Sequence, residues 1–232
     1  MNLGGLQKSS IINYPGKVSC VIFLSGCNFE CPYCHNPSLV RRGNECRDSL
    51  SVEDLYGFLK SRRHFLDGVV ISGGEPTLQK DIVSLCESIK RLGYSIKLDT
   101  NGSRPDELKR LIEHDLVDYI AMDIKTDPFN YYSLVKAPCN PEDILSSIIT
   151  IMKSAPDYEF RTTCVKGFVD ERIIEKIAAL IKGSRLYALQ RFNRSELLHP
   201  EFFSDAECGY GEEDMVNFKN IAEPWVQECI VR

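Results

Sequence analysis

Short apolar runs alternate with amphipathic segments along most of the chain, which predicts strands alternating with helices. The runs that predict strands are Val18 to Leu24, Val69 to Ser72, Ser95 to Asp99, Asp118 to Asp123, Tyr158 to Val165 and Arg185 to Gln190. The segments with helical spacing are Ser51 to Leu59, Leu78 to Leu92, Pro105 to Ile112, Pro141 to Met152 and Asp170 to Ile181. Six strand–helix units of this kind imply an all-parallel sheet.

Two α/β architectures fit this alternation, a doubly wound open sheet and a partial barrel. The doubly wound form is expected to carry a Gly-x-Gly-x-x-Gly turn after its first strand. Cysteines stand there instead, so we predict a partial (β/α)6 TIM-like barrel with parallel strands.

The segment 193–232 is polar, and it predicts a helix over Glu212 to Glu223 and a terminal strand over Val226 to Val231. No linker composition separates this segment from the rest of the chain. We therefore expect residues 1–232 to form a single domain, with a core at about 15–192 and a C-terminal extension at 193–232.

Composition bounds the class of protein. A chain of 232 residues that is 43% hydrophobic and 26% charged suits one globular domain. We read no secretory signal and no apolar run of membrane-spanning length, so we expect a cytoplasmic protein. Ten cysteines in such a chain indicate metal or redox roles rather than disulfides. The net charge of −5, without a long basic tract, disfavours nucleic acid as a partner.

Three cysteines gather directly after the first predicted strand. Cys27, Cys31 and Cys34 stand at Cys-x3-Cys-x2-Cys spacing, a density typical of zinc or iron–sulfur sites. A structural zinc site needs four ligands, usually from two separated groups, and Cys46 is only a lone distant candidate for the fourth. A [4Fe–4S] cluster held by three thiolates leaves one iron open. We therefore predict an iron–sulfur cluster, with a closed structural zinc site as the alternative.

Polar residues gather at the carboxyl ends of the predicted strands, where parallel α/β proteins build their sites. The candidate cofactor-binding residues are Tyr33, Gly73, Gly74, Glu75, Asp99, Asp123 and Lys125. The two glycines would let backbone approach a ligand without interference from a Cβ atom, and Glu75 would offer a carboxylate to a cationic group. Asp99 and Asp123 fit ribose hydroxyls or internal ion pairs. Tyr33 fits either a purine contact or an anchor for the loop.

Together these residues resemble the radical S-adenosylmethionine (SAM) superfamily. The spacing of Cys27, Cys31 and Cys34 matches its cluster motif, and Gly73-Gly74-Glu75-Pro76 matches its SAM-amino motif. Further stretches look like those of the anaerobic ribonucleoside-triphosphate reductase activating proteins: Gly5 to Ser10, Asn13 to Lys17, Cys31 to Pro37, Leu98 to Gly102, Met122 to Lys125 and Phe160 to Thr163. The resemblance runs from about Gly4 to Gln190.

The resemblance implies a radical mechanism in which the open iron of one [4Fe–4S] cluster chelates SAM. Reductive cleavage of the sulfonium would give methionine and a 5′-deoxyadenosyl radical, which takes a hydrogen atom from a glycine Cα of a large partner enzyme. The implied partner is an anaerobic ribonucleoside-triphosphate reductase, and the implied electron donor is flavodoxin- or ferredoxin-like. No general acid or base is needed for the core step, so we assign none.

The resemblance also assigns roles to residues. The implied cluster ligands are Cys27, Cys31 and Cys34; Glu75 would bind the SAM amino group, Tyr33 would lie near adenine, and Asp99, Asp123 and Lys125 would contact ribose and carboxylate. The chain lacks a second cysteine-rich insert, so one cluster is expected. Cys208 and Cys229 in the tail belong to no motif that we can assign.

Two other functions remain open at this point. One is a radical SAM enzyme that acts on a small molecule, such as a deazapurine-forming type, or on another glycyl-radical enzyme of the pyruvate formate-lyase type. The other is a non-catalytic zinc or iron–sulfur module. An apolar-rimmed open mouth would favour a protein substrate, and a closed polar pocket would favour a small one.

Overall fold

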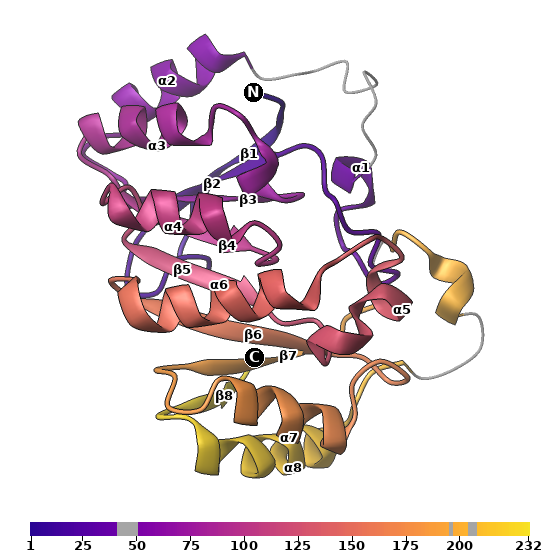
Figure 1. The fold of residues 1–232 in the computed structure, drawn as a ribbon. Helices are drawn as coiled ribbons and strands as arrows, with labels where there is room; N and C mark the ends of the chain where they lie inside the picture. The colour runs from indigo at the N-terminus through magenta and orange to yellow at the C-terminus, as the bar shows by residue number, and fades with distance from the viewer. Residues whose placement is uncertain (41–50, 195–196, 204–207) are drawn as a thin grey trace.

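The computed structural model describes residues 1–40, 51–194, 197–203 and 208–232. Cys46, the lone candidate for a fourth ligand, therefore lies outside the described residues. Within these ranges one sheet of eight strands runs in chain order from β1 to β8 (Figure 1). The strands are β1 (Leu3–Ser10), β2 (Ser19–Leu24), β3 (Gly68–Gly73), β4 (Ser95–Thr100), β5 (Tyr119–Asp123), β6 (Tyr158–Cys164), β7 (Tyr187–Arg191) and β8 (Cys229–Val231).

The six predicted parallel strands are confirmed as β2 to β7, but the prediction of an all-parallel sheet is wrong at one edge. β1 pairs antiparallel with β2, with Leu6 opposite Ile22. Its sequence, Leu3–Ser10, contains two adjacent glycines and a polar end, so no apolar alternation marks it as a strand. At the other edge β8 extends the parallel array beside β7, so segment 193–232 contributes a strand to the same sheet.

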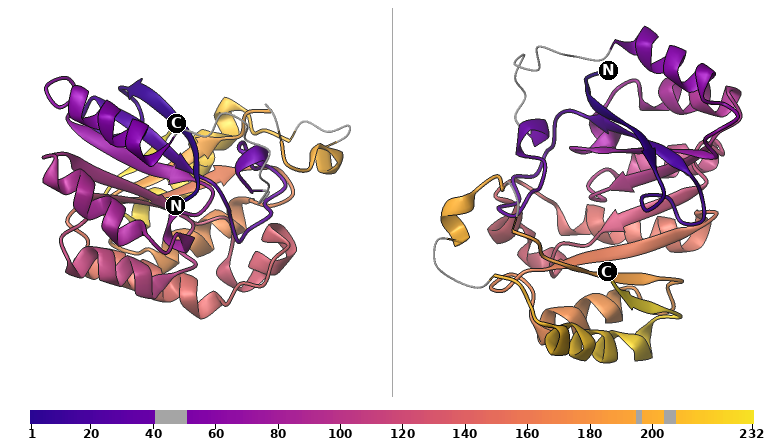
Figure 2. Two further views of the ribbon diagram at one scale, coloured as in Figure 1. Left: turned by 90° about the horizontal axis from the view of Figure 1, so that it is seen from above. Right: turned by 180° about the vertical axis from the view of Figure 1, so that it is seen from behind.

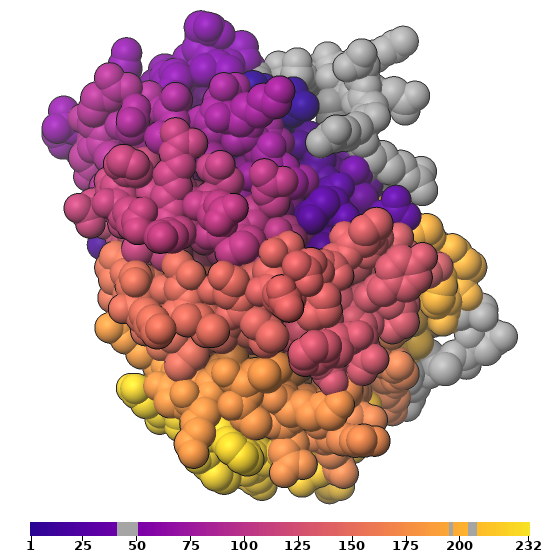
Figure 3. All heavy atoms as spheres, in the orientation of Figure 1, coloured from indigo at the N-terminus to yellow at the C-terminus, as the bar shows by residue number. Residues whose placement is uncertain are grey.

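The α-helices are α1 (Pro37–Val40), α2 (Val52–Ser61), α3 (Ile82–Arg91), α4 (Pro105–Glu113), α5 (Tyr131–Val135), α6 (Pro141–Ser154), α7 (Glu171–Leu180) and α8 (Glu212–Ala222). The 3-10 turns are η1 (Pro76–Leu78), η2 (Pro128–Asn130), η3 (Pro200–Phe203) and η4 (Glu223–Trp225). Helices α2, α3, α4, α6 and α7 cover one face of the sheet, and in the rear view the strands lie in front of them (Figure 2). From the helical side, side chains of these helices hide the sheet (Figure 3).

Local sequence explains where several helices begin. The Ser51 hydroxyl accepts a hydrogen bond from the backbone N–H of Asp54, and the Asp170 carboxyl accepts one from the N–H of Ile173. These two caps explain why the helices begin where the sequence predicts. The predicted helix from Leu78 to Leu92 is wrong in its first turn, because η1 is separate and α3 begins at Ile82. The connection from Thr126 to Asn140 also holds a short helix, α5, that the sequence analysis missed.

The two faces of the sheet differ in chemistry. On the face toward the helices, residues such as Ile22, Ile71 and Leu98 belong to one large apolar core. The opposite face has a small apolar cluster around Val21, Val70 and Tyr119. Beside this cluster, at alternate positions of β4, β5 and β6, the sheet carries the charged residues Lys97, Asp99, Asp123, Glu159 and Arg161, of which Asp123 and Arg161 stand directly opposite each other. Because side chains alternate along a strand, this polar row shares the concave face of the partial barrel.

No helix among the described residues has the length and apolar character needed to cross a membrane.

Candidate functional site

A cavity of about 260 Å³ lies at the carboxyl ends of the parallel strands. Its lining is formed by Cys27, Phe29, Cys31, Tyr33, Cys34, His35, Asn36, Val40, Ser72, Gly73, Gly74, Asp99, Thr100, Asn101, Asp123, Lys125, Arg161, Thr163 and Gln190. The structure therefore brings all of the predicted candidate residues to one cavity except Glu75.

The cysteine loop is held in place from two sides. The N–H of Gly26 donates to the carbonyl of Leu39, and the N–H of Glu30 donates to the carbonyl of Val135 over 2.8 Å. Phe29 is 2% exposed and meets Tyr131 of α5 edge to face, with 6.0 Å between ring centroids. The loop is thus fixed between α1 and α5, and Phe29 serves as its anchor.

The three thiols provide the donor set for a metal cluster. Burial raises the pKa of Cys27 to about 11 and that of Cys31 to about 12, and it also raises the pKa of Cys34. The thiols are neutral until a metal displaces their protons. In the part of the chain that the structure describes, no three His, Cys, Asp or Glu side chains converge on a single ion. A four-iron cube binds each thiolate at a different iron, so the three thiols fit it without converging.

Gly73 and Gly74 join the cysteine loop to the end of β3. The N–H of Gly74 donates to the carbonyl of Leu24, and the N–H of Glu75 donates to the carbonyl of Gly26. A Cβ atom on Gly73, where φ is +119°, would lie 2.4 Å from the Leu24 backbone, and one on Gly74 would lie 2.1 Å from the Gly26 carbonyl oxygen. Both glycines are therefore required by backbone packing against β2 and the loop, a reason that the sequence analysis did not give.

Glu75 is fully buried, and its carboxyl is occupied by protein donors. Oε1 accepts from the N–H and hydroxyl of Thr77 and from the hydroxyl of Thr100 over 2.8 Å, while Oε2 accepts from the N–H of Asn101 over 2.7 Å. Burial raises the pKa of Glu75 in spite of these four hydrogen bonds. The carboxyl joins η1 to the end of β4, and its predicted contact with a SAM amino group stays a prediction.

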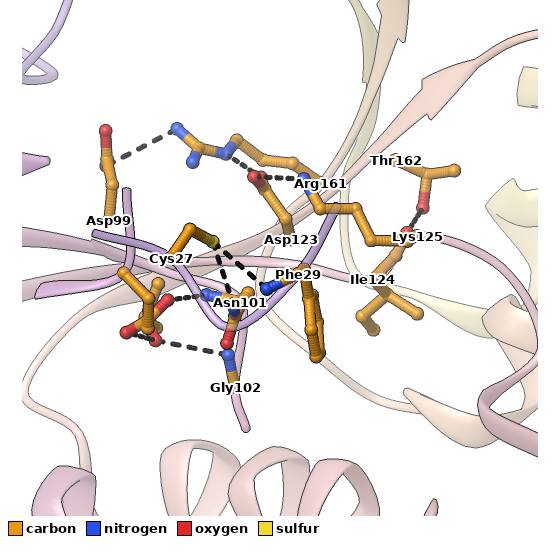
Figure 4. Close-up of polar contacts among 12 residues, drawn as sticks. Cys27, Phe29, Asp99, Asn101, Gly102, Asp123, Ile124, Lys125, Arg161 and Thr162 are labelled. Carbon is orange, nitrogen blue, oxygen red and sulfur yellow. Dashed lines mark hydrogen bonds and ion pairs between the residues drawn. The ribbon is translucent and has the colours of Figure 1, made fainter. Parts of the chain in front are cut away.

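Arg161 links the two predicted aspartates. Its Nε donates to Asp123 Oδ1 over 2.7 Å, and its Nη1 lies 3.4 Å from Asp99 Oδ1 (Figure 4). Lys125 Nζ donates to Asp123 Oδ2 over 2.8 Å, and Lys97 Nζ pairs with Asp99 Oδ1. Cations and carboxylates therefore alternate across the ends of β4, β5 and β6.

The cations determine the charge state of this row. Burial alone would raise the pKa of Asp123, but Arg161 and Lys125 outweigh it and hold the pKa far below its ordinary value. The pKa of Asp99 is likewise lowered, because Arg161 and Lys97 outweigh burial. Burial opposes the charge of Lys125, yet Asp123 raises the pKa of Lys125 above its ordinary value. Asp99, Asp123 and Lys125 are therefore ionised near neutral pH.

Tyr33 lies in the wall of the cavity rather than projecting into solvent. It is 3% exposed and packs against Phe168, with 6.1 Å between ring centroids. Its hydroxyl is buried and has no hydrogen-bond partner among the described residues. The ring forms part of the cavity wall against which a ligand would pack. Its contact with adenine remains a prediction.

In the sequence, Arg161 and Asn101 stand out only as members of stretches that resemble the activating proteins, whereas in the structure both line the cavity. The sequence analysis missed Lys97 and Glu159 altogether. The signal was present as alternation, since Lys97 and Asp99 in β4 and Glu159 and Arg161 in β6 stand two residues apart. Polar residues at this period within an otherwise buried strand indicate a charged interior face.

The Radical SAM superfamily profile matches residues 21–180 of the chain, which covers the cavity from the cysteine loop to β6. A protein of Methanocaldococcus jannaschii that is named as a glycyl-radical enzyme activating enzyme is 39% identical over 205 residues, 86% of this chain and 83% of that protein. A protein of the same name from Haemophilus influenzae is 29% identical over 185 residues, covering 70% of each chain.

Among solved structures, Streptococcus suis SuiB bound to S-adenosylmethionine aligns with a TM-score of 0.66 at 14% identity. The alignment covers 89% of this chain and 48% of SuiB, so the chain spans about half the length of this structural relative. At this identity the likeness concerns the fold, and it agrees with the predicted partial barrel. Radical SAM proteins use a [4Fe–4S] cluster and SAM, and the three thiols described above fit such a cluster. The chain belongs to the radical SAM superfamily and is a radical SAM enzyme.

Proposed function

We propose that this protein is a glycyl-radical enzyme activase whose substrate is an anaerobic ribonucleoside-triphosphate reductase. The observation that carries the proposal is one cavity lined by three thiols and by an ionised row of aspartates, lysine and arginine. The names of the M. jannaschii and H. influenzae relatives support the class of substrate. The choice of the reductase rests on the sequence segments that resemble its activating proteins.

In this proposal Cys27, Cys31 and Cys34 hold one [4Fe–4S] cluster. When bound, the cluster and SAM supply the chemistry, a one-electron cleavage of the sulfonium to methionine and a 5′-deoxyadenosyl radical. The residues of the chain bind and orient SAM. Lys125 and Arg161 are cations suited to its carboxylate.

The aspartates of the row would serve the other polar groups of SAM. The contacts of Asp99 with Lys97 and Arg161 both use Oδ1, so Asp99 is the acceptor that we assign to ribose hydroxyls or the ammonium group. Asp123 is bonded through both oxygens, to Arg161 and to Lys125. We therefore assign it first to the alignment of these two cations and second to SAM.

Exposed aromatic residues beside the cysteine loop support a protein substrate. We call Phe129, Tyr132 and Phe202 the aromatic rim; they are 69%, 71% and 46% exposed. Lys136, which follows α5, lies over the ring of Phe202 with 3.7 Å from Nζ to the centroid. Helix α5 and the segment before η3 are hydrogen-bonded to the cysteine loop, at Glu30 and Pro32 respectively. Large exposed apolar side chains beside such a loop favour contact with a partner protein.

The proposal is tested by electron paramagnetic resonance on the partner. The reconstituted, reduced protein is incubated with SAM and the reductase, and the expected result is a glycyl radical signal that requires the target glycine. A glycine-to-alanine variant of the reductase is the matched control and should give no signal. A glycyl radical signal on pyruvate formate-lyase but not on the reductase would show that the proposed partner is wrong and that the substrate is of the pyruvate formate-lyase type. Consumption of SAM without a radical on either enzyme would overturn the activase function.

We expect an electron donor of the flavodoxin or ferredoxin type. The same assay checks this, because replacing a chemical reductant by reduced flavodoxin should sustain formation of the radical.

A further inference from the structure

We propose that Asn101 tunes the reduction potential of the cluster assigned to Cys27, Cys31 and Cys34, by donating an N–H hydrogen bond to Cys27. Asn101 Nδ2 lies 4.0 Å from Cys27 Sγ, and the backbone N–H of Phe29 donates to the same sulfur over 3.4 Å. Figure 4 shows both donors directed at Cys27. The inference rests on the cluster and is independent of the identity of the partner enzyme.

The orientation of the Asn101 amide is fixed by its neighbours. Asn101 Oδ1 accepts from the backbone N–H of Ser103 over 3.0 Å and from the Ser103 hydroxyl over 2.6 Å. A backbone N–H can only donate, so the oxygen must face Ser103 and the NH2 group must face the other way. One N–H then reaches Asn28 Oδ1 over 3.0 Å, and the other is left for Cys27.

The position of Asn101 is fixed independently of its side chain. Its backbone N–H donates to Glu75 Oε2, and the residue is 6% exposed. Asn28 Nδ2 donates to the Ser103 hydroxyl over 2.9 Å, which closes a ring of three side chains. A donor held this firmly needs no reorganisation when the charge of the cluster changes.

A hydrogen bond to a ligating sulfur stabilises the reduced cluster, because the added electron increases negative charge on the sulfur atoms. Asn101 therefore raises the reduction potential and increases the reduced fraction at any given potential of the electron donor. Phe29 contributes a backbone donor that substitution does not remove. Asn101 is thus a side chain whose hydrogen bond to Cys27 a substitution can remove.

The test is potentiometric titration of the reconstituted holoprotein, followed by electron paramagnetic resonance of the reduced cluster. Asn101→Ala removes the donor, and we expect the reduced-to-oxidised ratio at fixed potential to fall about threefold to tenfold, the equivalent of one hydrogen bond. Asn101→Asp keeps the acceptor for Ser103 but replaces the donor by negative charge, so its potential should fall further. Ser103→Ala is the matched control and should keep the wild-type potential, because the Ser103 N–H still orients the amide.

Wild-type potentials in both Asn101 variants, with intact four-iron spectra, would overturn the proposal. So would failure of both variants to assemble the cluster while Ser103→Ala assembles it, because Asn101 would then be a structural residue of the loop. An equal shift in Ser103→Ala and Asn101→Ala would also count against it.

Discussion

Arg232 donates from Nη2 to Glu159 Oε2 over 2.7 Å, and so joins the segment after β8 to a carboxylate that is 1% exposed. The other oxygen of Glu159 lies 4.0 Å from Arg161 Nη1. Arg161 in turn holds both Asp99 and Asp123 at the cavity. The tail residue therefore balances a buried charge directly beneath the cavity, and Arg161 remains directed toward the two aspartates.

We expect Arg232→Ala to lower the free energy of unfolding by about 2 kcal/mol, because the Glu159 oxygen loses a charged donor. A double variant that adds Glu159→Gln to Arg232→Ala should recover part of the lost stability, because it removes the uncompensated charge of Glu159. Urea unfolding of the cluster-free proteins measures both effects. Equal stability of wild type and Arg232→Ala would show that this ion pair contributes nothing.

The ion pairs of Asp99 and Asp123 make the free energy of unfolding depend on pH in the acid range. Asp123 has a pKa held below its unfolded value of about 3.9. A carboxyl of this kind contributes stability above the unfolded pKa, and the contribution is lost as the pH falls through the folded pKa. The pKa of Asp99 is shifted in the same direction. We expect unfolding free energy to decline as the pH falls below about 4.

Asp123→Asn should flatten this acid decline, because Asn does not titrate. The matched control is Asp157→Asn, since Asp157 pairs with Arg185 at the surface with its side chain 56% exposed. Urea midpoints measured from pH 6 downwards compare the slopes. Parallel slopes for wild type and Asp123→Asn would contradict the ion-pair account.

Glu75→Ala should destabilise the protein more than Glu75→Gln does. Alanine leaves four donors without an acceptor. Glutamine keeps an oxygen that accepts from Thr77 and Thr100, and only its NH2 group faces another donor, the N–H of Asn101. Each unsatisfied buried group costs about 1–3 kcal/mol. Thermal or urea unfolding without the cluster gives the order. Loss of activity in Glu75→Ala therefore does not by itself identify a contact with SAM.

Gly74→Ala should impair cluster loading, because its Cβ would meet the Gly26 carbonyl oxygen at 2.1 Å and displace the cysteine loop. Overpacking of this kind costs about 1–3 kcal/mol. Gly57→Ala is the control, since a Cβ there meets nothing within 4 Å and an exposed helix favours alanine by about 1 kcal/mol. Iron content after reconstitution should fall in the first variant only. Full loading of Gly74→Ala would contradict the packing argument.

Local patterns predicted the six parallel strands and the helix starts at Ser51 and Asp170, because alternation and capping act over a few residues. They missed β1, because its sequence has no apolar alternation and its strand conformation depends on pairing with β2. They missed α5, which is only five residues long.

The contents of the cavity were predictable because parallel strands end at one edge of the sheet. The contacts among these residues were not predictable. Arg161 reaches Asp123 across 38 positions and Asp99 across 62, and Arg232 reaches Glu159 across 73. The hydrogen bond from Thr100 to Glu75 was not predictable for the same reason, because 25 positions separate the two residues in the sequence. A motif identifies the residue type, and only the fold shows whether its oxygens are already occupied.

The most direct measurement is quantification of 5′-deoxyadenosine and methionine after anaerobic reconstitution with iron and sulfide, chemical reduction and addition of SAM. A Cys31→Ser variant is the control. Wild type should show a four-iron spectrum and release the two products in equal amounts, and the variant should release neither. A wild-type chain that binds one zinc ion with a saturated ligand set and leaves SAM intact would contradict the account.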